Sequence, residues 1–139
     1  MHMTLEADYA VRIVELLSDA DQRIDAHTIS EKTQVPLRFA LKILRKLVTD
    51  GLVKSYKGAR GGYVIGRDPA TITLREVIES VEGPYMLSRC QQDAYCCTNH
   101  SCRVHKVYAE ISKMVRDKLD EYTFGSVKSR KETLEVPKE

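Results

Sequence analysis

Cysteine and histidine side chains gather in one short stretch of the sequence, where Cys90, Cys96 and Cys102 are followed by His105. Five residues separate each of these cysteines from the next, and two residues separate Cys102 from His105. Thiolates and imidazoles hold iron–sulfur clusters, and histidine in place of cysteine raises the cluster's potential. Because gaps of five residues leave a flexible loop that can wrap a cluster, the pattern predicts an iron–sulfur site.

Other interpretations of the same residues stay open. Structural zinc sites also use thiolates and imidazoles, although their cysteines commonly come in pairs two residues apart. A metal-free redox pair could form between the neighbouring Cys96 and Cys97, or between Cys90 and a partner. Cys97 could replace Cys96 as the middle ligand between Cys90 and Cys102. His100 is a weaker ligand candidate.

Length and apolar patterning exclude a membrane-spanning chain. The 139 residues are 42% apolar, which suits one modest globular unit, and the apolar runs are too short to span a bilayer. The first residues hold a carboxylate where a signal peptide needs its apolar segment. We therefore expect a cytoplasmic protein whose four cysteines are reduced and serve metal binding or redox chemistry.

Positive charge is concentrated in one segment. Residues 1–35 hold three basic and seven acidic side chains, a balance of −4, whereas residues 36–60 hold seven basic side chains and one acidic, a balance of +6. Such a stripe can neutralise phosphates and release their counterions, which drives nucleic-acid binding regardless of sequence. A solvated helix face would explain the charge equally well. The predicted secondary structure of residues 36–60 must therefore decide between that interpretation and nucleic-acid binding.

Those elements are predicted to form a helix-turn-helix. Helices are expected over residues 5–17, over residues 26–33 with Asp25 as N-cap, and from Pro36 to the stop at Gly51. The apolar stripe of the third helix comprises Leu37, Ala40, Leu41, Leu44, Leu47 and Val48. Its opposite side is basic, as in a helix that enters a DNA groove.

A small hairpin follows the third helix. Strands are expected at residues 52–56 and 63–65, joined by residues 57–62, whose three glycines allow a tight bend and whose Lys57 and Arg60 place charge at its tip. The predicted fold class is therefore mainly α with a small β wing, a winged helix-turn-helix. The residues expected to contact double-stranded DNA are Arg38, Phe39, Lys42, Arg45, Lys57 and Arg60.

We expect four segments along the chain: a DNA-binding domain over residues 1–84, a cysteine-rich loop over 85–101, a long dimerisation helix over 102–125 and a disordered tail over 126–139. The apolar face of the long helix comprises Val104, Val107, Tyr108, Ile111, Met114, Val115, Leu119 and Tyr122. A face this long needs a second surface, which favours dimerisation with a second copy over packing on its own domain.

Several motifs resemble those of the winged-helix regulators of the IscR, NsrR and CymR type. The resemblance covers roughly residues 3–122. Residues 8–12 look like the amino-terminal signature of that family, residues 51–63 resemble its wing, and residues 72–84 resemble the segment before its sensor loop. The cysteines match the cluster-binding branch.

The resemblance implies a homodimeric transcriptional regulator that binds an inverted-repeat operator and senses redox state, nitric oxide or iron–sulfur status through a cluster. Members similar to IscR have a histidine ligand where His105 falls, which favours a 2Fe–2S cluster. In members similar to NsrR, an aspartate from the first helix of the partner subunit completes the site where Asp8 falls, which gives a 4Fe–4S alternative. A zinc-bound or metal-free regulator with thiol-based sensing is the other possibility.

Catalysis is the competing class of function. Cys102 with His105, or Cys97 with His100, could form a nucleophilic pair, but no third orienting group can be identified. The glycines concentrate in the predicted wing rather than in a phosphate-binding loop. We therefore expect that the protein is not an enzyme.

Overall fold

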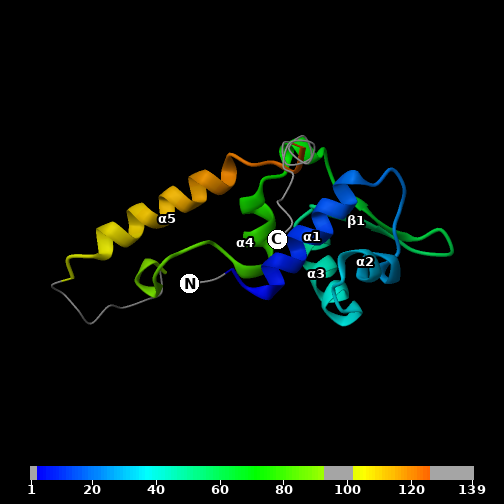
Figure 1. Ribbon diagram of the computed structural model, residues 1–139, viewed down its shortest axis with the longest axis horizontal. Helices are drawn as coiled ribbons and strands as arrows, with labels where there is room; N and C mark the ends of the chain where they lie inside the picture. Colours follow the sequence, from blue (N-terminus) through cyan, green and yellow to red (C-terminus); the bar gives the residue numbers. More distant parts are fainter. Residues whose placement is uncertain (1–2, 93–101, 126–139) are drawn as a thin grey trace, which may run out of the picture.

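The computed structural model describes residues 3–92 and 102–125. Its elements are α1 (Leu5–Asp19), α2 (Ala26–Thr33), α3 (Leu37–Thr49), β1 (Val53–Tyr56), β2 (Gly62–Ile65), α4 (Leu74–Glu82) and α5 (His105–Asp120), with short 3-10 turns η1 (Pro69–Thr71) and η2 (Arg89–Gln91). Figure 1 shows α1 to α4 and the strands in one body, from which α5 extends as an arm. The predicted fold class, a winged helix-turn-helix followed by a long helix, is confirmed.

The predicted tail, residues 126–139, lies outside the described residues, as does most of the predicted cysteine-rich loop. No helix in the described part of the chain has both the length and the apolar composition that crossing a membrane requires.

The second and third helices begin close to the predicted positions. The Asp25 carboxylate accepts a hydrogen bond from the Thr28 amide at 2.8 Å. Hydrogen bonds from Thr28 hold the pKa of Asp25 below its ordinary value, because they stabilise the carboxylate. As expected, α2 therefore begins at Ala26, whereas α3 begins at Leu37, one residue later than predicted, with Pro36 in the N-cap position.

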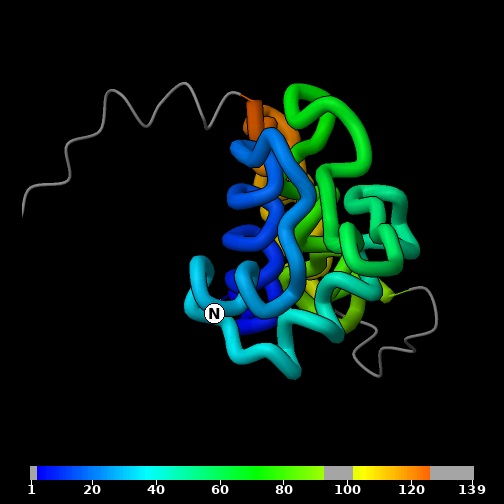
Figure 2. Tube along the Cα trace, turned by 90° about the vertical axis from the view of Figure 1, so that its right-hand side faces the viewer, coloured from blue at the N-terminus to red at the C-terminus, as the bar shows by residue number. Residues whose placement is uncertain are grey.

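The core is built around α1, against which α2, α3, α4 and β2 all pack (Figure 2). Ala7 and Ala10 of α1 are fully buried, and side chains this small let neighbouring elements approach closely. The larger fully buried side chains include Ile13, Ile29, Ile43, Leu44, Leu47, Ile72 and Val77. Each is worth about 1.5–3 kcal/mol of burial, so one core fixes the helices relative to one another.

The buried side of α3 differs from the predicted stripe. Ala40, Leu44 and Leu47 are fully buried as expected, but Leu41 is 42% exposed. Ile43, which the predicted stripe omits, is fully buried. The helix has enough apolar residues for two overlapping stripes, and packing against α1, α4 and β1 selects the one that contains Ile43.

β1 and β2 form the predicted antiparallel wing, with Tyr56 opposite Gly62 beside the turn. Ile24 adds a third backbone segment: its amide donates to the Tyr63 carbonyl at 3.1 Å, and its carbonyl accepts from the Tyr63 amide at 2.8 Å. Glycine is required at Gly62, where φ is 147° and a Cβ would lie 2.9 Å from the Ile24 carbonyl oxygen. The wing is therefore attached near its turn to the loop between α1 and α2.

α5 is shorter at both ends than the predicted helical segment. Cys102 precedes its first turn, so of these two predicted ligands only His105 lies in the helix. Beyond α5 the chain returns to the body, where Phe124 is buried and its amide donates to the Ile72 carbonyl at 3.0 Å. The end of α5 is thus fixed to the core, while its start lies far from it (Figure 1).

Truncating one apolar side chain on each side of α3 tests this orientation. Ile43→Ala leaves a cavity in the core and should lower the free energy of unfolding by about 2–5 kcal/mol. Leu41→Ala removes a side chain that is already half in solvent and should lower it by less than about 1 kcal/mol. Urea denaturation followed by circular dichroism measures both values, and equal losses would contradict the observed orientation.

Candidate functional site

The exposed side of α3 carries three of the predicted DNA-contacting cations. Arg38, Lys42 and Arg45 are exposed, and their spacing of four and three residues puts them on one face of the helix. Cations arranged this way on the second helix of a helix-turn-helix can face a major groove together. Tertiary packing therefore leaves the predicted basic face available.

Phe39, the apolar member of the predicted set, is held at the edge of this face. Its side chain is 38% exposed, and its ring centroid lies 6.2 Å from that of Tyr9 on α1. The Arg38 guanidinium lies 5.6 Å from the Phe39 ring. The ring is thus braced by α1 while one edge stays open for apolar contact, such as with a thymine methyl group.

Lys57 and Arg60 are exposed at the turn of the wing, as predicted. Sequence reasoning missed a third cation beside them, Arg23 in the loop between α1 and α2. Its guanidinium carbon lies 3.6 Å from the centroid of the Tyr56 ring. No local pattern could have marked Arg23, because its partners are distant in sequence.

Glu6 of α1 is another residue that sequence reasoning missed. Its Oε1 atom lies 3.2 Å from Lys42 Nζ and 3.5 Å from Lys46 Nζ. Partial burial raises the pKa of Glu6, but the hydrogen bond from Lys42 and the charge of Lys46 outweigh this effect and hold the pKa below its ordinary value. A carboxylate that stays charged at neutral pH competes with phosphate for Lys42.

Two of the predicted metal ligands meet in the structure. The Sγ atom of Cys90, in η2, lies 3.3 Å from Nδ1 of His105, the first residue of α5. The same thiol lies 3.3 Å from the Ser88 hydroxyl. A thiol and an imidazole that approach this closely from separate elements fit a shared metal or cluster.

The other predicted ligands are not joined to this pair. Cys102 is half-buried just before α5. Among residues 3–92 and 102–125, no group of three cysteine, histidine, aspartate or glutamate side chains converges as a metal site would require. Cys96, its alternative Cys97 and His100 lie outside the described residues.

Asp8, the alternative fourth ligand, has a cationic partner of its own. Its carboxylate pairs with Arg12 at 2.8 Å, one turn along α1. Arg12 also donates to the Thr33 carbonyl at 3.4 Å. Within one chain His105 lies beside Cys90, whereas the Asp8 alternative concerns a second subunit and stays a prediction.

A buried hydroxyl holds the segment around Cys90 against α5. Ser112 is fully buried; its hydroxyl donates to Gln91 Oε1 at 2.6 Å and accepts from the Leu87 amide at 2.9 Å. The Leu87 amide also lies 3.1 Å from Gln91 Oε1. These bonds fix the residues on both sides of Cys90 and so position its thiol near His105.

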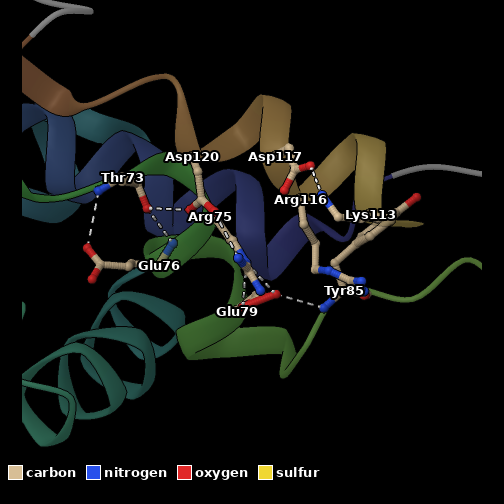
Figure 3. Close-up of polar contacts among 9 residues, drawn as sticks. All are labelled: Thr73, Arg75, Glu76, Glu79, Tyr85, Lys113, Arg116, Asp117 and Asp120. Carbon is tan, nitrogen blue, oxygen red and sulfur yellow. Dashed lines mark hydrogen bonds and ion pairs between the residues drawn. The ribbon is translucent and has the colours of Figure 1, made fainter. Parts of the chain in front are cut away.

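Charged side chains join α4, α5 and Tyr85 (Figure 3). Arg75 of α4 pairs with Asp120 of α5 at 2.8 Å and with Glu79 at 3.2 Å, and its hydrogen bonds to Asp120 and Glu79 raise its pKa. Glu79 accepts from the Tyr85 amide at 3.0 Å, while Arg116 donates to the Tyr85 carbonyl at 2.9 Å. The segment that leads to Cys90 is therefore tied to both helices.

The cationic α3 face and the basic wing define a winged-helix DNA-binding regulator, with a thiol–imidazole pair at the start of its long arm. Comparisons with known proteins agree. The chain belongs to the Rrf2 family, described as iron-dependent transcriptional regulators, which it matches over residues 3–130.

Individual relatives are transcriptional regulators too. Over 139 residues the chain is 30% identical to the HTH-type transcriptional regulator IscR of Escherichia coli (strain K12 / DH10B), covering 98% of this chain and 85% of the relative. The structure of CymR, the global cysteine regulator of B. subtilis, matches with a TM-score of 0.77 at 23% identity, covering 93% of this chain and 97% of CymR. IscR of T. potens gives a TM-score of 0.74 at 20% identity, covering 100% and 94%. The expected family is thus confirmed, and these relatives are regulators rather than enzymes.

Lys42→Ala and Glu6→Gln should change DNA binding in opposite directions. Lys42→Ala removes a cation facing the groove and should weaken binding to a duplex by about tenfold, with a salt slope smaller by about one. Glu6→Gln releases Lys42 and should strengthen binding about threefold, with a steeper salt dependence. Fluorescence anisotropy with a labelled duplex at several salt concentrations measures both effects.

The matched control is Glu110→Gln, which makes the same charge change at an exposed position of α5. If it strengthened binding as much as Glu6→Gln, net charge rather than the contact with Lys42 would explain the gain. Unchanged affinity and salt slope in Lys42→Ala would contradict the placement of α3 in the groove.

Proposed function

We propose that this protein is a cytoplasmic DNA-binding regulator that senses redox state, nitric oxide or iron–sulfur status through a bound iron–sulfur cluster. Cys90, Cys96, Cys102 and His105 would hold the cluster, with a 2Fe–2S form favoured. The observation that carries the proposal is the 3.3 Å approach of Cys90 Sγ to His105 Nδ1, which brings η2 against the first residue of α5. When bound, the cluster supplies a centre that oxygen or nitric oxide can modify.

A zinc-bound or metal-free regulator is the second candidate. Zinc also takes thiolate and imidazole ligands, so the contact between Cys90 and His105 is compatible with it. The His105 side chain is exposed and Cys90 is half-buried, so small oxidants can reach a group bound there, as a sensor requires. We therefore place the cluster first.

On the DNA side, we propose that α3 enters a major groove and that the wing reaches a neighbouring groove or its phosphates. Arg38, Phe39, Lys42 and Arg45 would contact DNA from α3, and Lys57 and Arg60 from the wing. All six residues are exposed. Two copies related by a two-fold axis would bind an inverted repeat, with half-sites about one helical turn apart.

We further propose that α5 pairs with its counterpart in a homodimer. Val104, Val107, Ile111 and Met114 recur at spacings of three and four residues and are 44%, 47%, 37% and 69% exposed. They form one apolar stripe on a helix that stands away from the body (Figure 1). Contiguous apolar surface of this kind is typical of an interaction site, and a second copy offers the same stripe in return.

A series of hydrogen bonds and ion pairs connects the segment before Cys90 to the basic face of α3. Tyr85 binds Glu79 of α4, and the carbonyl of Val81 at the end of α4 accepts from Lys46 Nζ at 3.3 Å. Lys46 in turn pairs with Glu6, the partner of Lys42. A shift of the segment at Cys90 can thus reach α3 through α4. Coupling of this kind is typically worth about 1–3 kcal/mol, or about 5–150-fold in DNA affinity.

Protein purified without air should be coloured and contain iron and acid-labile sulfide in about equal amounts. Cys90→Ser and Cys102→Ser should abolish the visible absorption, because each removes one ligand. Comparing Cys96→Ser with Cys97→Ser identifies the middle ligand, and comparing His105→Ala with Asp8→Ala identifies the fourth. Absorption spectra and metal analysis are the readouts.

Lys106→Ala, an exposed neighbour of His105, is the control and should keep the colour. A colourless protein that holds zinc alone and binds DNA unchanged after reconstitution would exclude the cluster. In that case the zinc-bound regulator would replace it.

Met114→Glu should dissociate the dimer, because it introduces a charge at the most exposed position of the apolar stripe. Sedimentation velocity at micromolar concentration should show a monomer for this variant and a dimer for the wild type. Lys106→Glu, outside the stripe, should remain dimeric. A wild-type monomer, or a dimer in both variants, would contradict the proposed interface.

A further inference from the structure

Arg23 links the loop between α1 and α2 to both ends of the wing turn. Its guanidinium carbon lies 3.6 Å from the centroid of the Tyr56 ring, at the end of β1. Its Nη1 atom also donates to the backbone carbonyl of Arg60 at 3.2 Å. One side chain therefore touches the residue before the turn and a residue within it.

The backbone places Arg23 in a fixed position to do this. The next residue, Ile24, forms two backbone hydrogen bonds with Tyr63 of β2, at 3.1 and 2.8 Å. Arg23 thus starts from a segment already attached to the sheet and projects toward the turn. The guanidinium lies over the Tyr56 ring and uses one N–H for the Arg60 carbonyl.

The turn has few other contacts that could hold it. Residues 54–60 are all exposed, and the ladder between the strands ends at the pair Tyr56 and Gly62. Within the turn, the Gly61 amide donates to the Gly58 carbonyl at 2.8 Å. A two-stranded hairpin is marginally stable by itself, so an external contact decides how far its tip moves.

We infer that Arg23 is a positioning residue for DNA binding, which holds the wing turn so that Lys57 and Arg60 face the duplex. The inference rests on the proposed role of the wing as a DNA-contacting element. Ordering the turn in the free protein lowers the conformational entropy lost on binding, which increases affinity without any new contact to DNA. Arg23 acts through Tyr56 and the Arg60 carbonyl rather than by touching phosphate.

Charge-preserving variants separate positioning from direct phosphate contact. Tyr56→Leu removes the ring and leaves every cation in place, whereas Tyr56→Phe keeps the ring. We expect Arg23→Ala and Tyr56→Leu each to weaken DNA binding by about fivefold, equivalent to about 1 kcal/mol, and Tyr56→Phe to match the wild type. Because both substitutions remove the contact between Arg23 and the Tyr56 ring, the double variant should lose little more than Arg23→Ala alone.

Amide hydrogen exchange of the free protein supplies a readout that does not involve DNA. The Gly61 amide, which is hydrogen-bonded within the turn, should exchange several-fold faster in Arg23→Ala and Tyr56→Leu, while amides of α1 and α3 stay unchanged. Both substituted residues are exposed, so the thermal midpoint should shift little.

Two outcomes would overturn the inference. One is unchanged exchange at Gly61 in Arg23→Ala. The other is a loss of affinity in Arg23→Ala, with a salt slope smaller by about one, that Tyr56→Leu does not reproduce, because Arg23 would then contact phosphate directly. A protein that does not bind DNA at all would refute the proposed function instead, and the exchange measurement would still decide whether Arg23 orders the turn.

Discussion

The position of α4 is the constraint on which the rest of the structure depends. Its last turn is held from the DNA-binding side, where Lys46 donates to the Val81 carbonyl and the Thr4 amide donates to Glu82 at 3.0 Å. It is held from the other side by Glu79, which binds the Tyr85 amide. One short helix therefore joins the basic face of α3 to the segment that carries Cys90, so a displacement of either one can be passed on through α4.

Charge on the DNA-binding side is balanced within the protein before any DNA arrives. The chain has a net charge of only +2, and the carboxylate of Glu6 lies between two lysines of α3. Such a pair weakens non-specific attraction to phosphate, because the cation must leave its carboxylate before it gains a new partner. A regulator benefits from this, since weaker non-specific binding raises the contribution of base contacts to site selection.

The two elements proposed to contact DNA differ in how they are held. α3 is packed into the core through Ile43, Leu44 and Leu47, so its basic face has a fixed orientation. The wing extends beyond the core and depends on the Ile24 backbone and the Arg23 side chain for its position. Changes in the core therefore affect α3 and overall stability together, whereas changes around the wing can alter binding and leave the fold intact.

Local pattern in the sequence was sufficient to predict the order of helices and strands, the Asp25 cap and the basic face of α3. Each of these features arises from residues that are neighbours along the chain. It was not sufficient to choose between Leu41 and Ile43, since two overlapping apolar stripes exist and only contact with α1, α4 and β1 selects one. The pairing of Glu6 with Lys42 and with Lys46 likewise required the fold. These contacts join separate helices, and no periodicity along one helix records what faces it from another.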